Sequence, residues 1–185
     1  MTVSNWLPTL QHLHIQHIFS PETSNANQQP SEYAFQAEFT AVFKQLLSQA
    51  YPHLGYRVLP EAKRTNENGR DRQRLDILLR DGGQPAYGFE LLVATSVRDF
   101  DNHLSRSRKY SVLHNCAICF MVNLCTDEKL VGYFGESISG VIPVHVVYNI
   151  NNGSAILYFR DTQKDVLMKG CEWRMSFIED TVADY

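Results

Sequence analysis

The fold of this chain is decided by two apolar runs, RLDILL at residues 74–79 and YGFELLV at residues 87–93, joined by the turn RDGGQP at residues 80–85. Each run is rich in strand-forming residues and carries one acid, Asp76 in the first and Glu90 in the second. A lone charge in such surroundings costs on the order of several kcal/mol, so each carboxylate needs a cation, a hydrogen-bond donor or a metal. Two carboxylates on neighbouring strands can converge on one ion, and ligands of this kind suit Mg²⁺.

Composition sets the limits within which this pair is interpreted. The chain has 185 residues, 44% of them apolar, and a net charge of −3, which predicts one folded domain without a global basic field. Basic residues nevertheless concentrate on both sides of Asp76 and Glu90: residues 63–74 hold five against two acids, and residues 98–109 hold four against two. No run is long enough for a transmembrane helix, and no signal peptide is visible, so we expect no membrane partner.

The cysteines are interpreted as structural. Cys116 and Cys119 have a spacing found in zinc sites, but they lie in a run that predicts a buried strand. Residues three apart on a regular strand point to opposite faces, so we expect these two not to share a metal. Cysteine usage of this kind favours a reducing compartment.

Apolar periodicity predicts an α/β fold with a mixed sheet. Residues 1–30 are predicted to form an N-terminal segment that ends in a polar linker, and residues 31–185 the folded domain. Ser31 is the expected N-cap of a helix that runs to Ala50. The other expected elements are strands at 56–60, 73–80, 86–94 and 115–124, a polar gap at 61–72, a helix at 99–110, a C-terminal β-hairpin of 143–150 and 154–159, and a last strand near 170–177.

The first helix places Glu38 among apolar neighbours at three and four residues, which is unusual for Glu. Two interpretations stay open: a flank residue whose charged head reaches water, or a functional acid. The second helix carries His103, Arg106 and Lys109 at successive three-residue steps, with Phe100 and Leu104 on its packing side.

The order of these features resembles the PD-(D/E)xK, restriction-endonuclease-like superfamily, in which a helix Glu, a strand Asp and a strand Glu precede a helix and a buried strand. Over residues 32–124 several short sequence motifs resemble, more specifically, those of the nuclease-like C-terminal domains of crinkler-type proteins of fungi and oomycetes. Those motifs are FQAEF at 35–39, LPE at 59–61, residues 69–76, GFELL at 88–92, DNHLSR at 101–106 and KY at 109–110.

The resemblance implies a restriction-endonuclease-like mixed sheet flanked by helices and a metal-dependent nuclease. It would act on DNA, with RNA as a second substrate, as the effector or toxin part of a crinkler-like protein in a nucleus. Its metal, Mg²⁺ or Mn²⁺, would be held by Asp76, Glu90 and Glu38, and Lys109 would join these three as a catalytic residue. Five further residues are implied to orient ligands or contact phosphate: Gln36, Glu61, Arg72, His103 and Arg106.

One departure from the superfamily pattern leaves the activity open. A lysine normally stands two residues after the second-strand acid, and this chain has Leu92 there. Lys109 or Arg106 can supply the missing cation from the following helix. Alternatively the site is inactive, and the fold binds nucleic acid or a host protein. A third alternative is a homodimer module that pairs through an edge strand within residues 141–159.

Purely structural roles for the acids also stay open at this point. Asp76 can be an ion-pair partner of Arg74 or Arg106, and Glu90 can be capped by backbone donors or by Arg98. Clustered acids mark functional sites more often than chance, which favours the functional interpretation.

Overall fold

The computed structural model describes residues 31–65, 72–93, 96–125, 133–149, 154–161 and 166–174. The predicted segment 1–30 lies outside these residues, as do residues 151–153, which join the two strands of the predicted hairpin. Within these residues, two α-helices, α3 (Glu32–Ala50) and α4 (Val97–Leu113), and a short 3₁₀ helix, η2 (Pro52–Leu54), accompany one sheet. Its strands are β1 (Arg57–Thr65), β2 (Arg72–Arg80), β3 (Ala86–Leu92), β4 (Cys116–Cys125), β5 (Val141–Asn149), β6 (Ser154–Asp161) and β7 (Val166–Arg174).

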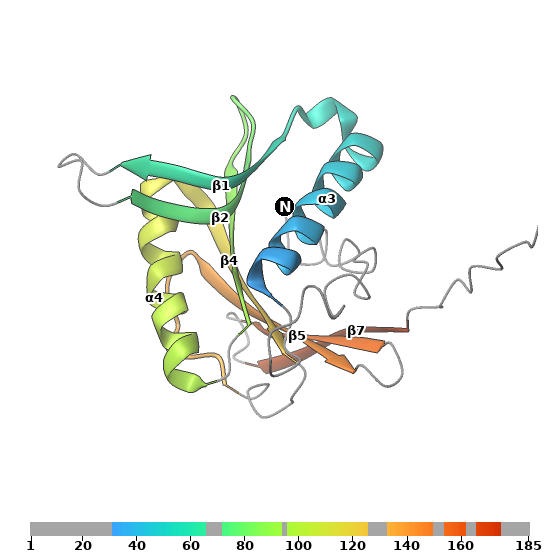
Figure 1. Ribbon diagram of the computed structural model, residues 1–185, viewed down its shortest axis with the longest axis vertical. Coiled ribbons are helices and arrows are strands. Elements are labelled where there is room, and N and C mark those ends of the chain that lie inside the picture. The colour runs from blue at the N-terminus through green and yellow to red at the C-terminus, as the bar shows by residue number, and fades with distance from the viewer. Residues whose placement is uncertain are drawn as a thin grey trace, which may run out of the picture.

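The seven strands follow one another in chain order across the sheet. The pairs β3–β4 and β4–β5 are parallel and the remaining pairs are antiparallel, so the sheet is mixed. Helix α4 provides the connection that a parallel pair requires between β3 and β4. The predicted α/β class with a mixed sheet is confirmed (Figure 1), and so is the C-terminal hairpin, in which Asn149 pairs with Ser154.

The C-terminal strands differ from expectation in one respect. The last strand begins at Val166 rather than near residue 170, and it pairs along the outer side of β6. Strands β5 and β6 therefore lie inside the sheet, and β7 forms its edge. Among the described helices, none combines the length and apolarity needed to cross a membrane.

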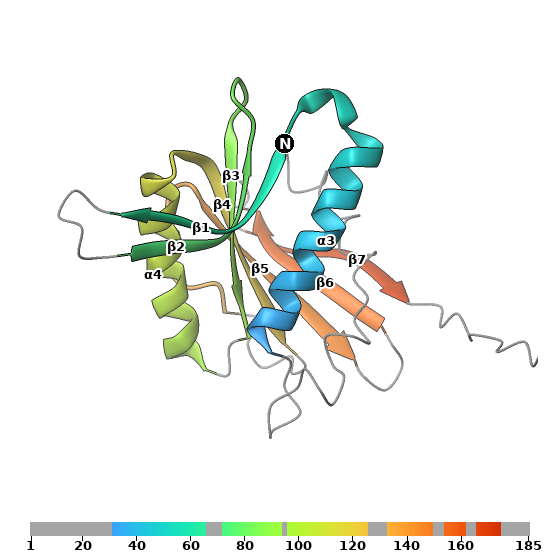
Figure 2. The same cartoon turned by 45° about the horizontal axis from the view of Figure 1, so that its top comes forward.

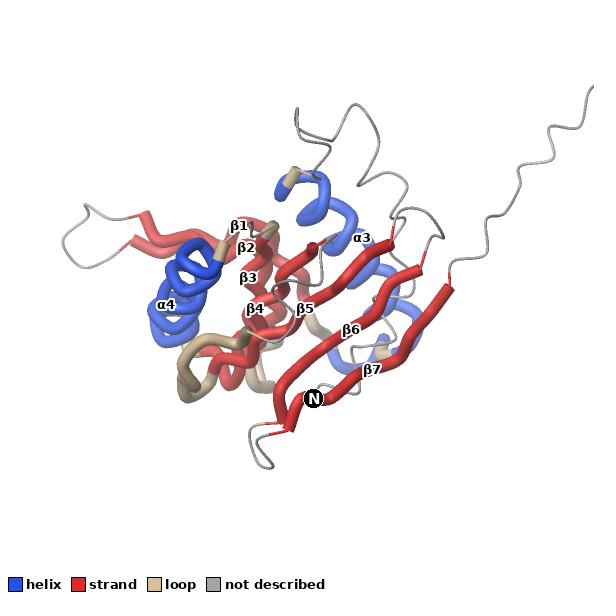
Figure 3. The backbone as a smooth tube through the Cα atoms, turned by 90° about the horizontal axis from the view of Figure 1, so that it is seen from below, coloured by secondary structure: helices blue, strands red, loops and turns tan. Residues whose placement is uncertain are grey.

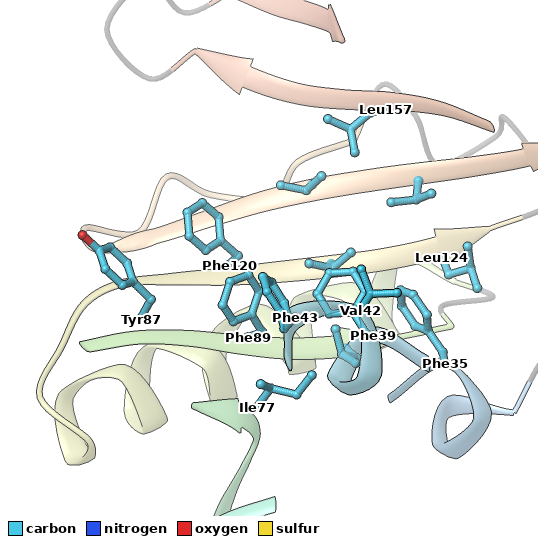
Figure 4. Close-up of a cluster of buried hydrophobic side chains, with 14 of the residues drawn as sticks. Phe35, Phe39, Val42, Phe43, Ile77, Tyr87, Phe89, Phe120, Leu124 and Leu157 are labelled. Atoms are coloured by element: carbon cyan, nitrogen blue, oxygen red, sulfur yellow. The ribbon is translucent and has the colours of Figure 1, made fainter. Parts of the chain in front are cut away.

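Helix α3 packs on one face of the sheet through aromatic side chains. Ser31 caps the helix as predicted, its hydroxyl accepting from the Tyr33 amide at 3.2 Å. Phe35, Phe39 and Phe43 recur every four residues and are fully buried (Figure 4). The ring centroids of Phe43 and Phe89 on β3 lie 4.6 Å apart, within the range for favourable aromatic pairs. This cluster anchors α3 to the central strands.

Helix α4 covers the opposite face, as Figures 2 and 3 show. Its Phe100 and Leu104 join a second buried cluster that contains Leu92 and Met121. Alternation along β3 divides the side chains between the layers: Leu91 belongs to the α3 cluster and Leu92 to the α4 cluster. Glu90, two residues before Leu92, therefore faces α4.

Beneath α4 lies a buried polar group that the sequence analysis did not identify. His145 on β5 is 0% exposed; its Nδ1 lies 3.1 Å from Asn123 Nδ2 and its Nε2 lies 2.8 Å from the Tyr133 carbonyl. The Phe100 ring stacks on the imidazole at 5.1 Å. Burial of the ring lowers the pKa of His145, against the opposing effect of the Tyr133 carbonyl, so the neutral imidazole is favoured.

The prediction that Cys116 and Cys119 point to opposite faces is wrong. The β3–β4 register shifts at the start of β4, where Ala86 pairs with Cys116 but Tyr87 pairs with Ile118, which leaves an extra residue. Both sulfurs consequently approach Gly88, each 3.2 Å from the position a Cβ would take there. Burial raises the pKa of Cys116 to about 11, so this thiol stays protonated at neutral pH.

Strand β1 is longer than predicted. The sequence analysis placed residues 61–65 in a polar gap, but they continue β1 and pair with β2 up to Thr65–Arg72. Beyond the body of the sheet, β1 and β2 form a two-stranded arm that passes beside α4 (Figure 1). The polar composition of residues 61–65, in which only Ala62 is apolar, gave no strand pattern in the sequence.

Candidate functional site

Asp76 and Glu90 lie where β2 and β3 stop pairing. The antiparallel ladder between these strands covers residues 77–79 and 87–89, and the two acids are the next residues beyond it. Side chains replace the ladder at this point: Asp76 Oδ2 accepts from the Leu91 amide at 2.8 Å, and Gln36 Nε2 donates to the Asp76 carbonyl oxygen at 2.8 Å. Buried backbone groups are thereby satisfied while the strands diverge.

Glu90 is fully buried and paired on one side only. Its Oε1 lies 2.6 Å from Arg106 Nη2 and 3.4 Å from His103 Nδ1. Its Oε2 makes no hydrogen bond with any described residue, and the side chain is only 1% exposed, so solvent does not satisfy this oxygen either. His103 and Arg106 are three residues apart on α4, so they present adjacent positions to the same carboxylate. The suggested partner Arg98 is thus replaced by Arg106.

The two carboxylates interact electrostatically. Burial raises the pKa of Asp76 to about 7, and the negative charge of Glu90 adds to the effect. The Leu91 amide and the Arg74 guanidinium oppose it, and Glu32 reinforces it. Asp76 therefore titrates near neutral pH, as expected when two carboxylates share a poorly solvated site.

A small cavity of about 70 Å³ lies beside Asp76. Its lining comes from the first turns of α3, from β2 and from β3: Glu32, Tyr33, Gln36, Arg74, Asp76 and Leu91. The helix acid at this cavity is Glu32, which lies one turn before Gln36 on the same side of α3. Glu38 is only partly buried and lies about 200° around the helix from Gln36, at 100° per residue, so it does not line the cavity.

The predicted cations of α4 separate into two groups. His103 is buried and Arg106 reaches Glu90, whereas Lys109 is exposed. Each three-residue step falls about 60° short of a full turn, which rotates Lys109 away from the sheet. Tyr110, four residues after Arg106, continues the inward face, and its pKa is raised by burial, with Arg106 opposing and Glu90 reinforcing the shift. Of the two α4 cations Arg106 and Lys109, it is Arg106 that reaches the acid pair.

The other predicted residues lie along the arm and on β3. Glu61 adopts a positive φ of 49° and pairs with Arg74 at 3.1 Å and Lys63 at 3.8 Å. The backbone of Arg72 belongs to β2, and its side chain lies outside the described part of the chain. Leu92, in the position of the superfamily lysine, is 0% exposed within the apolar cluster under α4.

The structure thus brings together part of the predicted set. Asp76, Glu90, Gln36, His103 and Arg106 meet, and Glu61 connects to them through Arg74. Across residues 31–65, 72–93, 96–125, 133–149, 154–161 and 166–174, no group of three or more His, Cys, Asp or Glu side chains is placed to hold a metal ion.

The sequence analysis missed three residues that lie at this site: Glu32, Tyr33 and Tyr110. Helical spacing, four residues from Gln36 and from Arg106, could have identified the first and the last.

Comparison with known proteins adds little to this picture. No protein-family model matches the chain, and no curated protein sequence matches it. Among solved structures, the chain is similar to one in the assembly of Thermococcus gammatolerans McrB AAA+ hexamers with bound McrC, at 14% identity and a TM-score of 0.39 over 66% of this chain and 28% of that one. It is also similar to SSO0001, at 11% identity and a TM-score of 0.32 over 84% of this chain and 60% of that one. Similarities of this size carry no argument about function.

Proposed function

We propose that this chain is a metal-dependent phosphodiesterase of the nuclease type, with Asp76 and Glu90 as its metal ligands. The observation that carries the proposal is the buried, unpartnered Oε2 of Glu90 beside a second carboxylate whose pKa is raised to about 7. Leaving a buried acceptor unsatisfied and two acids in mutual repulsion costs stability, and a divalent cation between them relieves both. Two carboxylates are what Mg²⁺ commonly takes from a protein.

The chain's own residues divide the remaining tasks. Gln36 holds the main-chain carbonyl of Asp76, and the Leu91 amide holds its carboxylate, so the carboxylate cannot turn away without breaking the bond to Leu91. Arg106 holds Glu90 through Oε1 and leaves Oε2 available. When bound, Mg²⁺ or Mn²⁺ would polarise a phosphodiester and lower the pKa of a water for attack on phosphorus.

Arg106 is our candidate for the cation that Leu92 does not provide. The Arg106 side chain is 47% exposed, so its guanidinium can pair with Glu90 and still reach a phosphate from the solvent side. The pKa of Arg106 is raised: burial lowers it, but the hydrogen bond to Glu90 and the charge of that carboxylate outweigh the burial, so this cation stays charged. Glu38 and Lys109, implied by the crinkler resemblance, are not part of this proposal.

The test is cleavage of supercoiled plasmid DNA, and of a single-stranded RNA, with Mg²⁺, Mn²⁺ or EDTA. We expect metal-dependent nicking that Asp76→Asn and Glu90→Gln each abolish, with Glu136→Gln, at an exposed acid, as the matched control. Binding of Mn²⁺, followed by electron paramagnetic resonance, should be lost in the same two variants. No cleavage and no Mn²⁺ binding by folded wild-type protein would contradict the proposal.

A second candidate is an inactive nuclease-like fold that binds nucleic acid. Two observations favour it: the lysine position holds the buried Leu92, and Arg106 already neutralises Glu90 at 2.6 Å. In that case the protein binds DNA equally well in EDTA and in Mg²⁺, does not cut it, and is indifferent to Glu90→Gln.

A further inference from the structure

Two of the four cysteines of this chain meet on the face of the sheet that α4 covers. Cys119 belongs to the buried cluster under α4, and Cys116 packs against that cluster from a partly buried position. The bulge at the start of β4 places these cysteines opposite Ala86 and Gly88, which are two residues apart on one face of β3. The two thiols thus occupy neighbouring positions on one face, which a regular strand would not allow at this spacing.

Gly88 defines how close the two sulfurs come. Each sulfur lies 3.2 Å from the position that a Cβ would take at Gly88, so the sulfurs are separated by no more than twice this distance. Because glycine places no side chain there, the two sulfurs and Leu75 surround that point instead. After burial, the charge of Cys116 is the next cause that raises the pKa of Cys119, which agrees with this proximity.

One of the two thiols is accessible through a pocket at the surface. The pocket has a volume of about 490 Å³ and lies between the turn after β2 and the turn after α4. Cys116 lines it together with Arg80, Gln84 and Asn115, whereas Cys119 is 0% exposed. A small ion can therefore reach Cys116 from solvent and be held on its inner side by Cys119.

The two sulfurs fit a soft cation of low coordination number. In the part of the chain that the structure describes, no third His, Cys, Asp or Glu side chain completes a metal-holding group with this pair. Structural Zn²⁺ takes four ligands and Mg²⁺ takes oxygen, so two sulfurs alone suit neither ion. Thiolates select Cu(I), a closed-shell ion that accepts two sulfurs in line. The sulfurs would then be two metal–sulfur bonds apart, roughly 4.6 Å for bonds of Zn–S length, which is within the limit at Gly88.

A disulfide between the same two residues fits the geometry less well. Neighbouring positions on one face of a strand are separated by roughly 6.5 Å. The Cβ atoms of a disulfide lie only about 3.8 Å apart. Closing this disulfide would distort β4, whereas an ion can bridge the sulfurs of side chains that project side by side.

We propose that Cys116 and Cys119 form a two-thiolate site for Cu(I). On binding, both S–H bonds break, two Cu–S bonds form and two protons pass to solvent, with no change of oxidation state. The resulting group carries one negative charge, and Arg80 is the neighbouring cation. The charge of Arg80 lowers the pKa of Cys116, against the larger effect of burial, which places the guanidinium close to this sulfur. The site does not rest on the proposed nuclease function.

The experiment offers Cu(I) to the protein anaerobically as its coloured complex with the chelator bicinchoninate, and native mass spectrometry counts the bound ions. Wild-type protein should take up one Cu(I) per chain with the loss of two protons. Cys116→Ser and Cys119→Ala should each lose the bound ion, with circular dichroism to confirm that they fold. Cys125→Ser is the matched control, at another buried thiol of β4, and should keep the ion.

Each outcome decides for or against the site. One ion in wild type and Cys125→Ser that is absent from both Cys116→Ser and Cys119→Ala supports it. Retention of the ion by either of these two variants in folded form overturns it, as does failure of the wild type to take Cu(I) from the chelator. Half an ion per chain with a doubled mass would place Cu(I) between two copies and reject the proposal. Loss of two hydrogens to a Cys116–Cys119 disulfide, in place of a bound ion, would reject it as well.

Discussion

Replacing Asp76 by Asn should stabilise the metal-free protein at and above neutral pH. The Asn side-chain oxygen can still accept from the Leu91 amide, which Asp76 binds at 2.8 Å, while the cost of a buried charge and the repulsion from Glu90 disappear. The folded-state pKa of Asp76 is about 7 against an ordinary value of 3.8. At about 1.4 kcal/mol per pH unit, and allowing for partial exposure, the gain is on the order of 3 kcal/mol.

The pH dependence gives this prediction its sign. Between about pH 4 and 7 the folded protein holds a proton at Asp76 that the unfolded chain has released, so this residue makes wild-type stability fall as pH rises through that window. Above pH 7 its effect is constant. The advantage of Asp76→Asn should therefore be absent near pH 4, grow to pH 7 and then level off.

Urea unfolding followed by circular dichroism at several pH values measures the effect. Glu136→Gln, which removes an exposed acid, should show no such growth. Saturating Mg²⁺ should reduce or reverse the advantage, because only the wild-type pair would gain from the ion. An advantage that does not vary with pH in EDTA would refute the electrostatic reasoning and make the raised pKa irrelevant to folding.

Three further outcomes follow from contacts described above. Arg106→Ala should lower the free energy of unfolding in urea by roughly 2–4 kcal/mol. This is somewhat below the loss for fully buried ion pairs, because the Arg106 side chain is 47% exposed. Adding Glu90→Gln to the same chain should restore most of the loss. Gly88→Ala should cost about 1–3 kcal/mol, since its Cβ would lie 2.9 Å from Leu75 Cδ2; an unchanged thermal midpoint would contradict this packing. The buried His145 imidazole has a lowered pKa, so below about pH 6.5 the unfolded chain binds a proton more readily than the folded protein, and stability falls with pH. In His145→Gln the free energy of unfolding should fall less steeply below that pH.

The fold was predictable from the sequence to the extent that strands and helices bury one side. The runs around Asp76 and Glu90 and the stripe of Phe35, Phe39 and Phe43 satisfy simple periodicities, and the structure confirms them. Residues 61–65 of β1 were not predicted as a strand because all of them except Ala62 are polar, whereas the facing strand β2 was predicted at 73–80. The Cys116–Cys119 geometry was missed because one extra residue in β4 reverses the alternation, and no local pattern announces such a bulge.

The site was predictable only in part because sequence order does not give direction around a helix. Asp76 and Glu90 were found from their apolar context. Glu38 was taken from its position in a resembling pattern, and the turn of α3 instead brings Glu32 to the cavity. Lys109 was likewise implied by the resemblance, but three-residue steps from His103 rotate around the helix, and Lys109 is exposed.

Because β2 and β3 stop pairing at Asp76 and Glu90, the backbone amide of Leu91 is hydrogen-bonded to the site itself. The Leu91 N–H donates to a carboxylate instead of a strand carbonyl, so its chemical shift and exchange with solvent should respond to whatever Asp76 holds. Protonation and cation binding would each alter that one bond, with the paired residues 87–89 on the same strand as an internal reference. A single backbone nucleus can thus follow the titration of Asp76 by nuclear magnetic resonance, and it would also report the proposed cation.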